Sequence, residues 1–528
     1  MTLRHLRNIL GLALAVCSAQ AISQPAPSQP APTVTLTNGK LRGALAPSGE
    51  AVFKGIPFAQ PPVGNLRWRE PLPAQPWPGI RDATTFSPAC VQSGNEGASS
   101  SEDCLYLNVW TPTWPMRSPA AVMLWIYGGG NFAGATSDPI FNGEALARHG
   151  VILVTANYRL GVFGFFAHTE LTRASPHHSS GNYGLLDQIA AMQWVHDNIA
   201  KFGGDPTNVT IFGESAGSLD INVLMASPLS RGLFRRVIGE SGPIIAPPPL
   251  SDGEKKGVDL AAKLNAPTIA QLRALPAATL QAATGQGLGY LGANLGVTVD
   301  GWVLPESPIK VFAEGREQHV DLMLGSNSQE LQKPFFPMPA DLRQAITQQY
   351  GPLAPRALAA YKLDSATDPA PDPELGPVLA QWATDSQFRC GTEAELLWHT
   401  AAKNRGYQFQ FSRPAVGKES LGAPHGSEVP FVFGTLDNPR YNDTDREISR
   451  FVQLYWTSFA RTGDPNNHPG LRDWPDVPMW PAFDADTRSF MDINSSKDQT
   501  TAKPLAKRGL QREACDVYTD LLKSKLSQ

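Results

Sequence analysis

Residues 208–227 read NVTIFGESAGSLDINVLMAS and contain the only GxSxG pattern of the chain, from Gly213 to Gly217. An apolar run precedes this pattern and a helix-compatible stretch follows it. A serine at a tight turn between a strand and a helix is typical of a nucleophile elbow, in which flanking glycines leave room beside the serine. The pattern therefore predicts that Ser215 is a nucleophile. The alternative is an ordinary glycine-rich turn with a capping serine.

Further apolar runs on the N-terminal side of this stretch indicate the fold class. Ala120–Tyr127 and Val151–Ala156, like Val209–Phe212, are continuously apolar, which is typical of strands buried on both faces of a parallel sheet. Between the last two runs, Leu185–Phe202 has helical spacing and is followed by Gly203. Strand, helix and strand in this order predict a doubly wound α/β fold with a large, mostly parallel sheet.

Two segments at the periphery of this predicted sheet also have clear patterns. TVTLTNGKLRG, residues 33–43, alternates around Asn38-Gly39 and predicts a hairpin whose turn is formed by these two residues. Residues 251–287 are rich in Ala and Leu with helical spacing and predict a lid or cap over a sheet edge. No linker is evident within residues 33–528, which we therefore expect to form a single catalytic domain with insertions.

A glycine run supplies candidate donors for an oxyanion hole. The predicted strand at residues 120–127 leads directly into Gly128-Gly129-Gly130. Glycines let backbone N–H groups approach a tetrahedral oxyanion without obstruction, so we expect Gly129, Gly130 and the N–H of Ala216 to act together. The alternative for the glycine run is an anion-binding loop or a flexible turn.

A nucleophilic serine also needs a base and an acid, which hydrolases with this elbow supply in the order serine, acid, histidine. Three downstream histidines are candidates, His399, His425 and His468, and spacing alone does not choose firmly among them. His425 lies in the loop GAPHGS, which favours a positioned imidazole. For the acid, Glu330 follows the apolar run at residues 320–327; the alternative is a solvated loop glutamate.

The N-terminal segment and the overall composition predict an exported protein. Arg4 and Arg7 precede a short apolar run that ends before Ala19-Gln20-Ala21, so residues 1–21 are typical of a signal peptide and residues 22–32 of a Pro-rich, disordered spacer. Lys and Arg total 44 against 48 Asp and Glu, which disfavours nucleic acid as a partner. No segment has the length and apolar character of a membrane span. The expected location is the periplasm or the medium, and the sequence predicts no oligomeric state.

Several long motifs resemble the type-B carboxylesterases, the family of the cholinesterases and bacterial para-nitrobenzyl esterases. The motifs follow one another in the family's order over nearly the whole mature chain: FKGIPFAQPPVGNLRWREP, SEDCLYLNVW, WIYGGG, ANYRLGVFGF, GNYGLLDQ, FGGDPTNVTIFGESAG and HGSEVPFVFG. The resemblance implies an α/β-hydrolase fold with an N-terminal hairpin and helical insertions. It also implies a serine ester hydrolase that needs no cofactor or metal and acts on small-molecule esters.

The resemblance assigns roles residue by residue. It implies a catalytic triad of Ser215, Glu330 and His425, and an oxyanion hole of Gly129, Gly130 and Ala216. Supporting roles are implied for two further side chains. Glu214 resembles the family's buried acid beside the nucleophile. Ser241 matches a buried serine that helps to hold the triad acid in the family. The implied disulfides join Cys90 to Cys104 and Cys390 to Cys515; the spacing of the four cysteines alone leaves three pairings open.

Departures from the family pattern concern the substrate. Residues 91–103 contain no aromatic side chain on which a quaternary ammonium could rest, so choline esters are not expected to be preferred. Asn131 replaces an aromatic residue found in many relatives and would place an amide beside the acyl site. Asp220 brings a charge to a helix expected to be buried, and the sequence does not reveal its partner.

The sequence therefore predicts a carboxylesterase that hydrolyses small to medium esters through an acyl-enzyme. Two alternatives stay open. The enzyme could be specific for a narrow class of esters, such as feruloyl, tannin or mycotoxin esters. The second alternative is that the protein is a non-catalytic binding member of the same fold, although this chain keeps every catalytic position of the family.

Overall fold

The computed structural model describes residues 30–92, 100–284, 295–335, 338–414, 417, 421–468, 470, 478–493 and 504–526. The predicted signal peptide and most of the predicted spacer lie outside these ranges. Residues 32–528 group into one compact unit by their backbone contacts.

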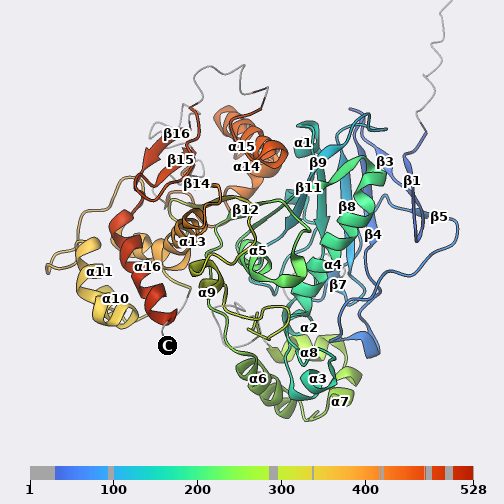
Figure 1. Cartoon of the computed structure of the whole chain (residues 1–528), viewed down its shortest axis with the longest axis horizontal. Coiled ribbons are helices and arrows are strands. Elements are labelled where there is room, and N and C mark those ends of the chain that lie inside the picture. Colours follow the sequence, from blue (N-terminus) through green and yellow to red (C-terminus); the bar gives the residue numbers. More distant parts are fainter. Residues whose placement is uncertain are drawn as a thin grey trace, which may run out of the picture. The chain divides into compact units, whose positions relative to one another are not determined.

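Within the described residues, the centre of the fold is an eleven-stranded mixed sheet (Figure 1). Its strands are β3 (Ala44–Leu45), β4 (Ala51–Pro57), β8 (Tyr106–Thr111), β9 (Ala120–Ile126), β10 (Ile152–Ala156), β11 (Gly204–Glu214), β12 (Arg236–Glu240), β13 (Asp321–Asn327), β14 (Gly406–Phe411), β15 (Ser489–Ile493) and β16 (Leu505–Arg508). From edge to edge they are ordered β16-β15-β14-β13-β12-β11-β9-β10-β8-β4-β3. All neighbours from β15 to β10 pair in parallel, and the strands outside this range pair antiparallel. This arrangement confirms the predicted α/β class with a mostly parallel sheet.

The predicted apolar runs coincide with central strands. Every residue of β9 and β10 is buried, because helices cover both faces of a parallel sheet. β11 is longer than the predicted run and begins at Gly204, which pairs with Ala120 before an irregularity in register leads to the Val209 pairing with Val122. The extension is polar at residues 205–208, which explains why apolar patterning alone did not predict it.

The helices flank this sheet on both faces. They are α1 (Glu144–Arg148), α2 (Gly161–Gly164), α3 (Thr169–Ala174), α4 (Tyr183–Asn198), α5 (Ala216–Ala226), α6 (Leu250–Lys263), α7 (Ile269–Ala274), α8 (Ala277–Thr284), α9 (Pro308–Ala313), α10 (Leu342–Tyr350), α11 (Ala354–Ala360), α12 (Val378–Thr384), α13 (Cys390–Ala401), α14 (Val429–Phe433), α15 (Asp443–Thr462) and α16 (Arg512–Leu526). Helices α4, α5 and α13 pack on one face, and α1 and α15 on the other. The predicted helix at residues 185–202 is α4, which ends in a turn of 3₁₀-helix at residues 199–202.

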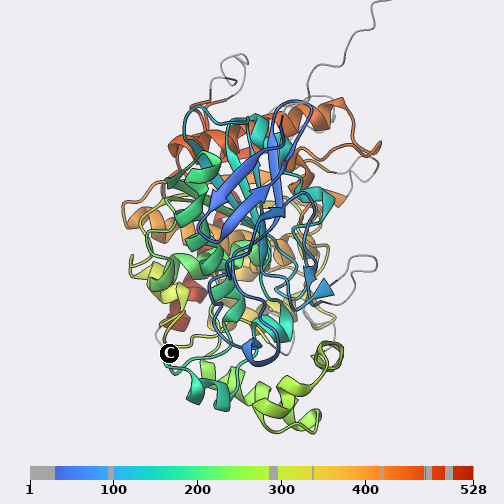
Figure 2. The same ribbon diagram turned by 90° about the vertical axis from the view of Figure 1, so that its right-hand side faces the viewer.

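The N-terminal hairpin forms, but its turn differs from the prediction by one residue. Strands β1 (Thr33–Leu36) and β2 (Gly39–Arg42) pair with Leu36 opposite Gly39, so Thr37 and Asn38 form the turn (Figure 2). Gly39 instead opens the second strand at φ 149°, and a Cβ there would lie 2.5 Å from the indole of Trp77. The glycine is therefore required for packing against Trp77. Together with β5 (Ile80–Asp82), the hairpin forms a separate three-stranded sheet.

The helical region predicted over residues 251–287 corresponds to α6 to α8 as far as residue 284, and residues 285–287 lie outside the described residues. These helices do not cover a sheet edge. They share a second apolar cluster with α2 and the start of α4, in which Val162, Leu185, Leu260, Leu272 and Leu280 are buried. Figure 2 shows α6, α7 and α8 gathered at one end of the molecule. Through this cluster, α6 to α8 pack against the segment that follows β10.

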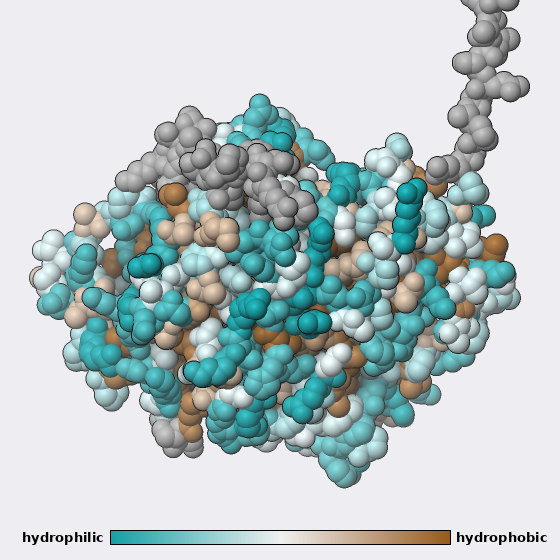
Figure 3. All heavy atoms as spheres, turned by 45° about the horizontal axis from the view of Figure 1, so that its top comes forward, coloured by the Kyte–Doolittle hydropathy of each residue, from teal (hydrophilic) through white to brown (hydrophobic). Residues whose placement is uncertain are grey.

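The surface is predominantly polar on the face shown in Figure 3, where hydrophobic side chains are scattered among hydrophilic ones. Among the helices of the described residues, none combines the length and the apolar character needed to cross a bilayer.

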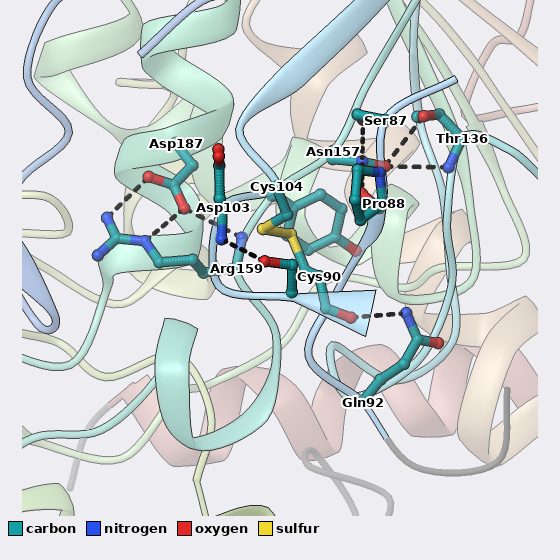
Figure 4. Close-up of a disulfide and its surroundings, with 12 residues drawn as sticks. Ser87, Pro88, Cys90, Gln92, Asp103, Cys104, Thr136, Asn157, Arg159 and Asp187 are labelled. Carbon is teal, nitrogen blue, oxygen red and sulfur yellow. Dashed lines mark hydrogen bonds and ion pairs between the residues drawn. A yellow bond between two sulfur atoms is a disulfide. The ribbon is translucent and has the colours of Figure 1, made fainter. Parts of the chain in front are cut away.

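Two disulfides join the same cysteines that the family resemblance implies, Cys90 to Cys104 and Cys390 to Cys515. Figure 4 shows the first of them in its surroundings. Beside it, Gln92 donates from Nε2 to the carbonyls of Cys90 at 3.1 Å and Gly134 at 2.7 Å and accepts from the Gly134 N–H at 2.9 Å. The disulfide loop is thereby fastened to the segment that follows the glycine run at residues 128–130.

The two disulfides should stabilise the protein to different degrees, because they close loops of 14 and 125 residues. We expect the pair Cys390→Ala and Cys515→Ala to lower the free energy of unfolding by about 5 kcal/mol, and the pair Cys90→Ala and Cys104→Ala by about 3 kcal/mol. Urea unfolding of both double variants measures this. Equal or reversed losses would contradict the loop-length argument.

Candidate active site

The candidate site lies at the carboxyl ends of four neighbouring parallel strands. Gly128–Gly130 follow β9, Ser215 follows β11, Ser241 follows β12, and Glu330 lies just beyond β13. Parallel strands end at the same edge of a sheet, and ligands of α/β folds bind at that edge. The topology alone therefore brings four separate sequence motifs together.

Ser215 lies at a sharp turn between β11 and α5, with φ 55° and ψ −122°. Its N–H donates to the carbonyl of Glu240 on the neighbouring strand at 2.9 Å. The glycines of the motif permit close packing: a Cβ at Gly217 would lie 2.0 Å from the carbonyl oxygen of Ile126, and one at Gly213 2.6 Å from the same oxygen. The GxSxG pattern thus forms the strand, tight turn and helix that it predicts.

The structure brings the three predicted triad residues together. His425 Nε2 lies 2.8 Å from Ser215 Oγ, and His425 Nδ1 lies 2.8 Å from Glu330 Oε2. Both distances are those of good hydrogen bonds. The imidazole therefore bridges the serine hydroxyl and the carboxylate, with one ring nitrogen for each.

Glu330 is held in place by its second oxygen. Oε1 accepts hydrogen bonds from Ser241 Oγ and from the backbone N–H of Asn327, both at 2.6 Å. The His425 N–H donates to the Glu330 carbonyl at 3.0 Å, which fixes the two residues to each other through the backbone as well. Glu330 is only 2% exposed. The carboxylate is therefore oriented before any substrate enters.

A positioning element that the sequence did not predict is a turn of π-helix at residues 385–389, between α12 and α13. Its Arg389 is fully buried, pairs with Asp385, and donates to the carbonyl of Ser328 at 2.8 Å, two residues before Glu330. Its Phe388 ring lies 4.6 Å from the His425 ring between centroids. Such π-turns often occur at functional sites, but no sequence pattern used here distinguishes them from ordinary helix.

The other two candidate histidines have different surroundings. His399 is fully buried on α13, with Nδ1 2.9 Å from Glu317 Oε1 and Nε2 2.9 Å from the Val320 carbonyl oxygen. His468 accepts a hydrogen bond from the Gly470 N–H. Neither lies against Ser215, so His425 is the candidate base.

Three further carboxyl groups, those of Glu214, Glu240 and Glu428, are buried in this region, and Glu214 and Glu428 act electrostatically on the imidazole. Glu214 Oε1 lies 3.3 Å from His425 Nε2. Glu240 accepts from Trp456 Nε1 at 2.8 Å, and Glu428 accepts from Asn327 Nδ2 at 2.5 Å. Burial raises the pKa of all three carboxyl groups above their ordinary values, because a low-dielectric interior disfavours the charged form.

The pKa of the His425 imidazole is also raised, but for a different reason. Burial by itself would lower the pKa of His425, but the negative charges of Glu214 and Glu330 outweigh burial and raise this pKa above that of a free imidazole. The protonated imidazole is therefore stabilised at this site. That is the form a general base adopts after it has accepted a proton.

The glycine loop faces the same cavity as the serine. Gly129, at φ 98°, and Gly130, at φ 66°, line it together with Ser215 and Ala216. A Cβ at Gly129 would lie 2.3 Å from the Ala133 carbonyl oxygen, so glycine is required there. Ala216 is the first residue of α5, where backbone N–H groups have no acceptor within the helix. All three backbone segments expected to form an oxyanion hole thus border the space next to Ser215.

Asn131 does not place an amide beside the acyl site, as its sequence position suggests it would. It is 2% exposed, and its Nδ2 donates to Asp220 Oδ1 at 2.8 Å while Tyr158 donates to its Oδ1 at 3.0 Å. Gln188 Nε2 donates to the other Asp220 oxygen at 2.6 Å. The two departures from the family pattern are therefore partners, and together they link the glycine loop to the helix that follows the nucleophile.

The cavity above Ser215 has a volume of about 750 Å³. Near the serine its wall is mainly apolar and includes Leu219, Ile244, Phe335 and Phe388. A volume of this size accommodates a small to medium organic molecule. Among the described residues, no group of three or more His, Cys, Asp or Glu side chains is arranged to hold a metal ion.

Comparisons with known proteins agree with this geometry. A sequence profile of the Carboxylesterase family matches residues 30–517. The chain is 36% identical over 455 residues to a fumonisin B1 esterase of Sphingopyxis macrogoltabida, covering 82% of this chain and 81% of that protein. It is 32% identical over 551 aligned positions to carboxylesterase 1C of Rattus norvegicus, covering 94% of each.

Solved structures of two esterases superpose on the chain. A PNB esterase gives a TM-score of 0.76 at 32% identity, and a thermophilic PNB esterase gives 0.78 at 31% identity. In both comparisons the match covers 92% of this chain and 99% of the other.

The Asp220 network generates a prediction about stability. Asp220→Leu keeps the branching of the side chain but removes the carboxylate that accepts from Asn131 Nδ2 and Gln188 Nε2, and we expect it to lower the free energy of unfolding by about 3 kcal/mol. Asp220→Asn is the matched control. Gln188 Oε1 has no hydrogen-bond partner among the described residues, so rotation of the Gln188 amide can satisfy the new NH₂ group. Equal urea midpoints for the two variants would contradict the network's role.

Proposed function

The chain belongs to the carboxylesterase family, has the α/β-hydrolase fold and is a carboxylic-ester hydrolase; we propose that it hydrolyses its substrates through an acyl-enzyme formed on Ser215. The observation that carries this proposal is the continuous chain of hydrogen bonds from Ser215 Oγ through the His425 imidazole to Glu330. Each catalytic role then follows from the position of the side chain in that chain of hydrogen bonds.

In the first step, His425 Nε2 accepts the proton of Ser215 as Oγ attacks the ester carbonyl carbon. Glu330 keeps Nδ1 protonated, so that Nε2 is free to act as the base, and stabilises the imidazolium that forms. The imidazolium then returns its proton to the alkoxy oxygen, and the alcohol leaves. In the second step, a water molecule loses a proton to His425 and attacks the acyl group, which releases the acid and regenerates Ser215.

The tetrahedral intermediates of both steps carry a negative oxygen. We assign its stabilisation to the N–H groups of Gly129, Gly130 and Ala216, which border the space beside Ser215. Loss of one such donor lowers kcat by about 10²- to 10³-fold in well-studied hydrolases, because the donors are already in place and need no reorganisation.

Small to medium carboxylic esters are the proposed substrates. The cavity volume and its apolar wall near Ser215 support an uncharged acyl group at that position. The similarity to a fumonisin B1 esterase makes a narrow specificity for a larger natural ester the second candidate. A panel of esters that varies acyl length and alcohol size decides between a broad and a narrow range.

Export is the proposed route for this enzyme. The two disulfides support it, since such bonds persist in oxidising compartments. The predicted signal peptide at residues 1–21 would direct it there, to the periplasm or the medium.

Ser215→Ala tests the nucleophile. We expect kcat/KM for p-nitrophenyl acetate to fall by about 10⁴-fold or more, because no other group can form the acyl-enzyme. Ser241→Ala is the control: it removes one donor to Glu330 but leaves Ser215, and should lower activity far less. A fluorophosphonate probe should label the wild type and the Ser241 variant but not the Ser215 variant. Substantial turnover by a folded Ser215→Ala protein would refute the assignment.

The pH profile tests the base. Activity requires neutral His425, so kcat/KM should rise with pH through an ionisation above about pH 6.5, the value of a free imidazole. Glu214→Gln removes a negative charge 3.3 Å from Nε2, destabilises the imidazolium, and should move this rise about one pH unit lower. An unchanged or upward-shifted profile in Glu214→Gln would contradict the proposed electrostatics.

A further inference from the structure

Two lysines line the cavity above Ser215 from different parts of the chain. Lys256 belongs to α6 and Lys525 to α16. Among the ion pairs of the described residues, none includes either lysine. The cavity lining therefore includes two lysines that form no ion pair with an acidic side chain of the described residues.

Helix geometry explains why these two lysines, and not their neighbours, belong to the cavity wall. On α16, Tyr518, Leu522 and Lys525 line the cavity at i, i+4 and i+7, which lie on one face of a helix. On α6, Gly253 and Lys256 line it at i and i+3. Both lysines thus lie on helix faces that turn toward the space above Ser215.

The neighbouring lysines of the same helices face elsewhere and are paired. Lys255 is 80% exposed and lies 3.7 Å from Asp259. Lys523 is 57% exposed and lies 3.9 Å from Asp520. Neither lines the cavity. The two helices therefore offer a matched control beside each cavity lysine.

Negative charge on the cavity wall is confined to its catalytic end. Of the described residues that line the cavity, Glu214 is the only one with a carboxyl group, and it lies next to Ser215 and His425. The wall near the serine is apolar, whereas Lys256 and Lys525 are exposed side chains. A cleft with unpaired charge of one sign attracts ligands of the opposite sign.

We propose that Lys256 and Lys525 form an anion subsite, and that the enzyme prefers esters that carry a free carboxylate separated from the scissile bond by several other bonds. The separation follows from the place of Glu214: a carboxylate next to the scissile bond would meet the Glu214 carboxylate beside His425, whereas Lys256 and Lys525 line the cavity from two other helices, α6 and α16. This inference rests on the proposed function and names its substrate class.

Two pairs of esters test the proposal. Monobenzyl adipate and benzyl hexanoate differ by a carboxylate at the end of the acyl chain. The acetate esters of 4-(hydroxymethyl)benzoic acid and of 4-methylbenzyl alcohol differ by a carboxylate on the alcohol. For each pair, the measured quantity is the kcat/KM of the acidic ester divided by that of the neutral ester. The pair with the higher ratio shows whether the enzyme prefers the carboxylate on the acyl side or on the alcohol side of the ester.

Variants of the two lysines should lower this ratio. An exposed ion pair contributes modestly, so we expect a fall of about threefold for Lys256→Gln or Lys525→Gln and about tenfold for the double variant in at least one ester pair. Lys255→Gln and Lys523→Gln should keep the wild-type ratio, as should Lys256→Arg. Raising the salt concentration from about 20 mM to about 500 mM should lower the wild-type ratio, because ions screen exposed charges.

The possible failures are distinguishable. If the wild type hydrolyses the neutral esters but the double variant keeps the wild-type ratio for both pairs, the anion subsite is refuted and the proposed function stands. If the control variants lower the ratio as much as the cavity variants, general surface charge is responsible and the subsite is again refuted. If the folded wild type hydrolyses no ester of either pair, the proposed range of small to medium esters fails and this inference fails with it.

Discussion

The tight turn at Ser215 is the constraint on which the rest of the site depends. A backbone at φ 55° and ψ −122° is sparsely populated for a residue with a side chain, and such conformations cost about 1–3 kcal/mol. The turn persists because its surroundings leave no alternative: β11 pairs on both sides, and the Ser215 N–H is bound to the Glu240 carbonyl. The close contact of Gly217 with the Ile126 carbonyl then sets where α5 begins, and with it the position of the Ala216 N–H.

The electrostatics of the site follow from the burial that this turn requires. The nucleophile lies at the carboxyl ends of the strands, and Glu214 and Glu428 are buried near its base, with Glu240 buried next to Glu214 and Glu428. Desolvation favours the neutral form of each carboxyl group, whereas a charged Glu214 or Glu330 stabilises the imidazolium. When His425 accepts the proton of Ser215, the carboxylates of Glu214 and Glu330 therefore stabilise the imidazolium that forms.

Variation within this family fold is local and is compensated locally. Asn131 and Asp220 each depart from the family pattern and are hydrogen-bonded to each other, so the glycine loop and α5 are joined by a polar link inside the protein. The region of α6 to α8 is a second example of such local packing. Helices α6 to α8 bury a second apolar cluster on α2, which leaves one face of α6 to line the cavity. Such changes can alter the cavity without disturbing the strands that position the triad.

Sequence patterns were sufficient to predict the class of the sheet and the strand, turn and helix around Ser215, because these depend on local periodicity and on glycine at fixed positions. It left His399, His425 and His468 as candidate bases, and only the family resemblance favoured His425 strongly. It also misplaced the hairpin turn, because packing of Gly39 on Trp77 is a contact between residues that local patterning does not relate. Only the packed structure shows the partner of Asp220, the π-turn that holds Arg389 against the acid loop, and the place of Lys256 and Lys525 in the lining of one cavity. Each of these joins residues distant in sequence, and their distance in space is set by the packing of the whole sheet and its helices rather than by any local pattern.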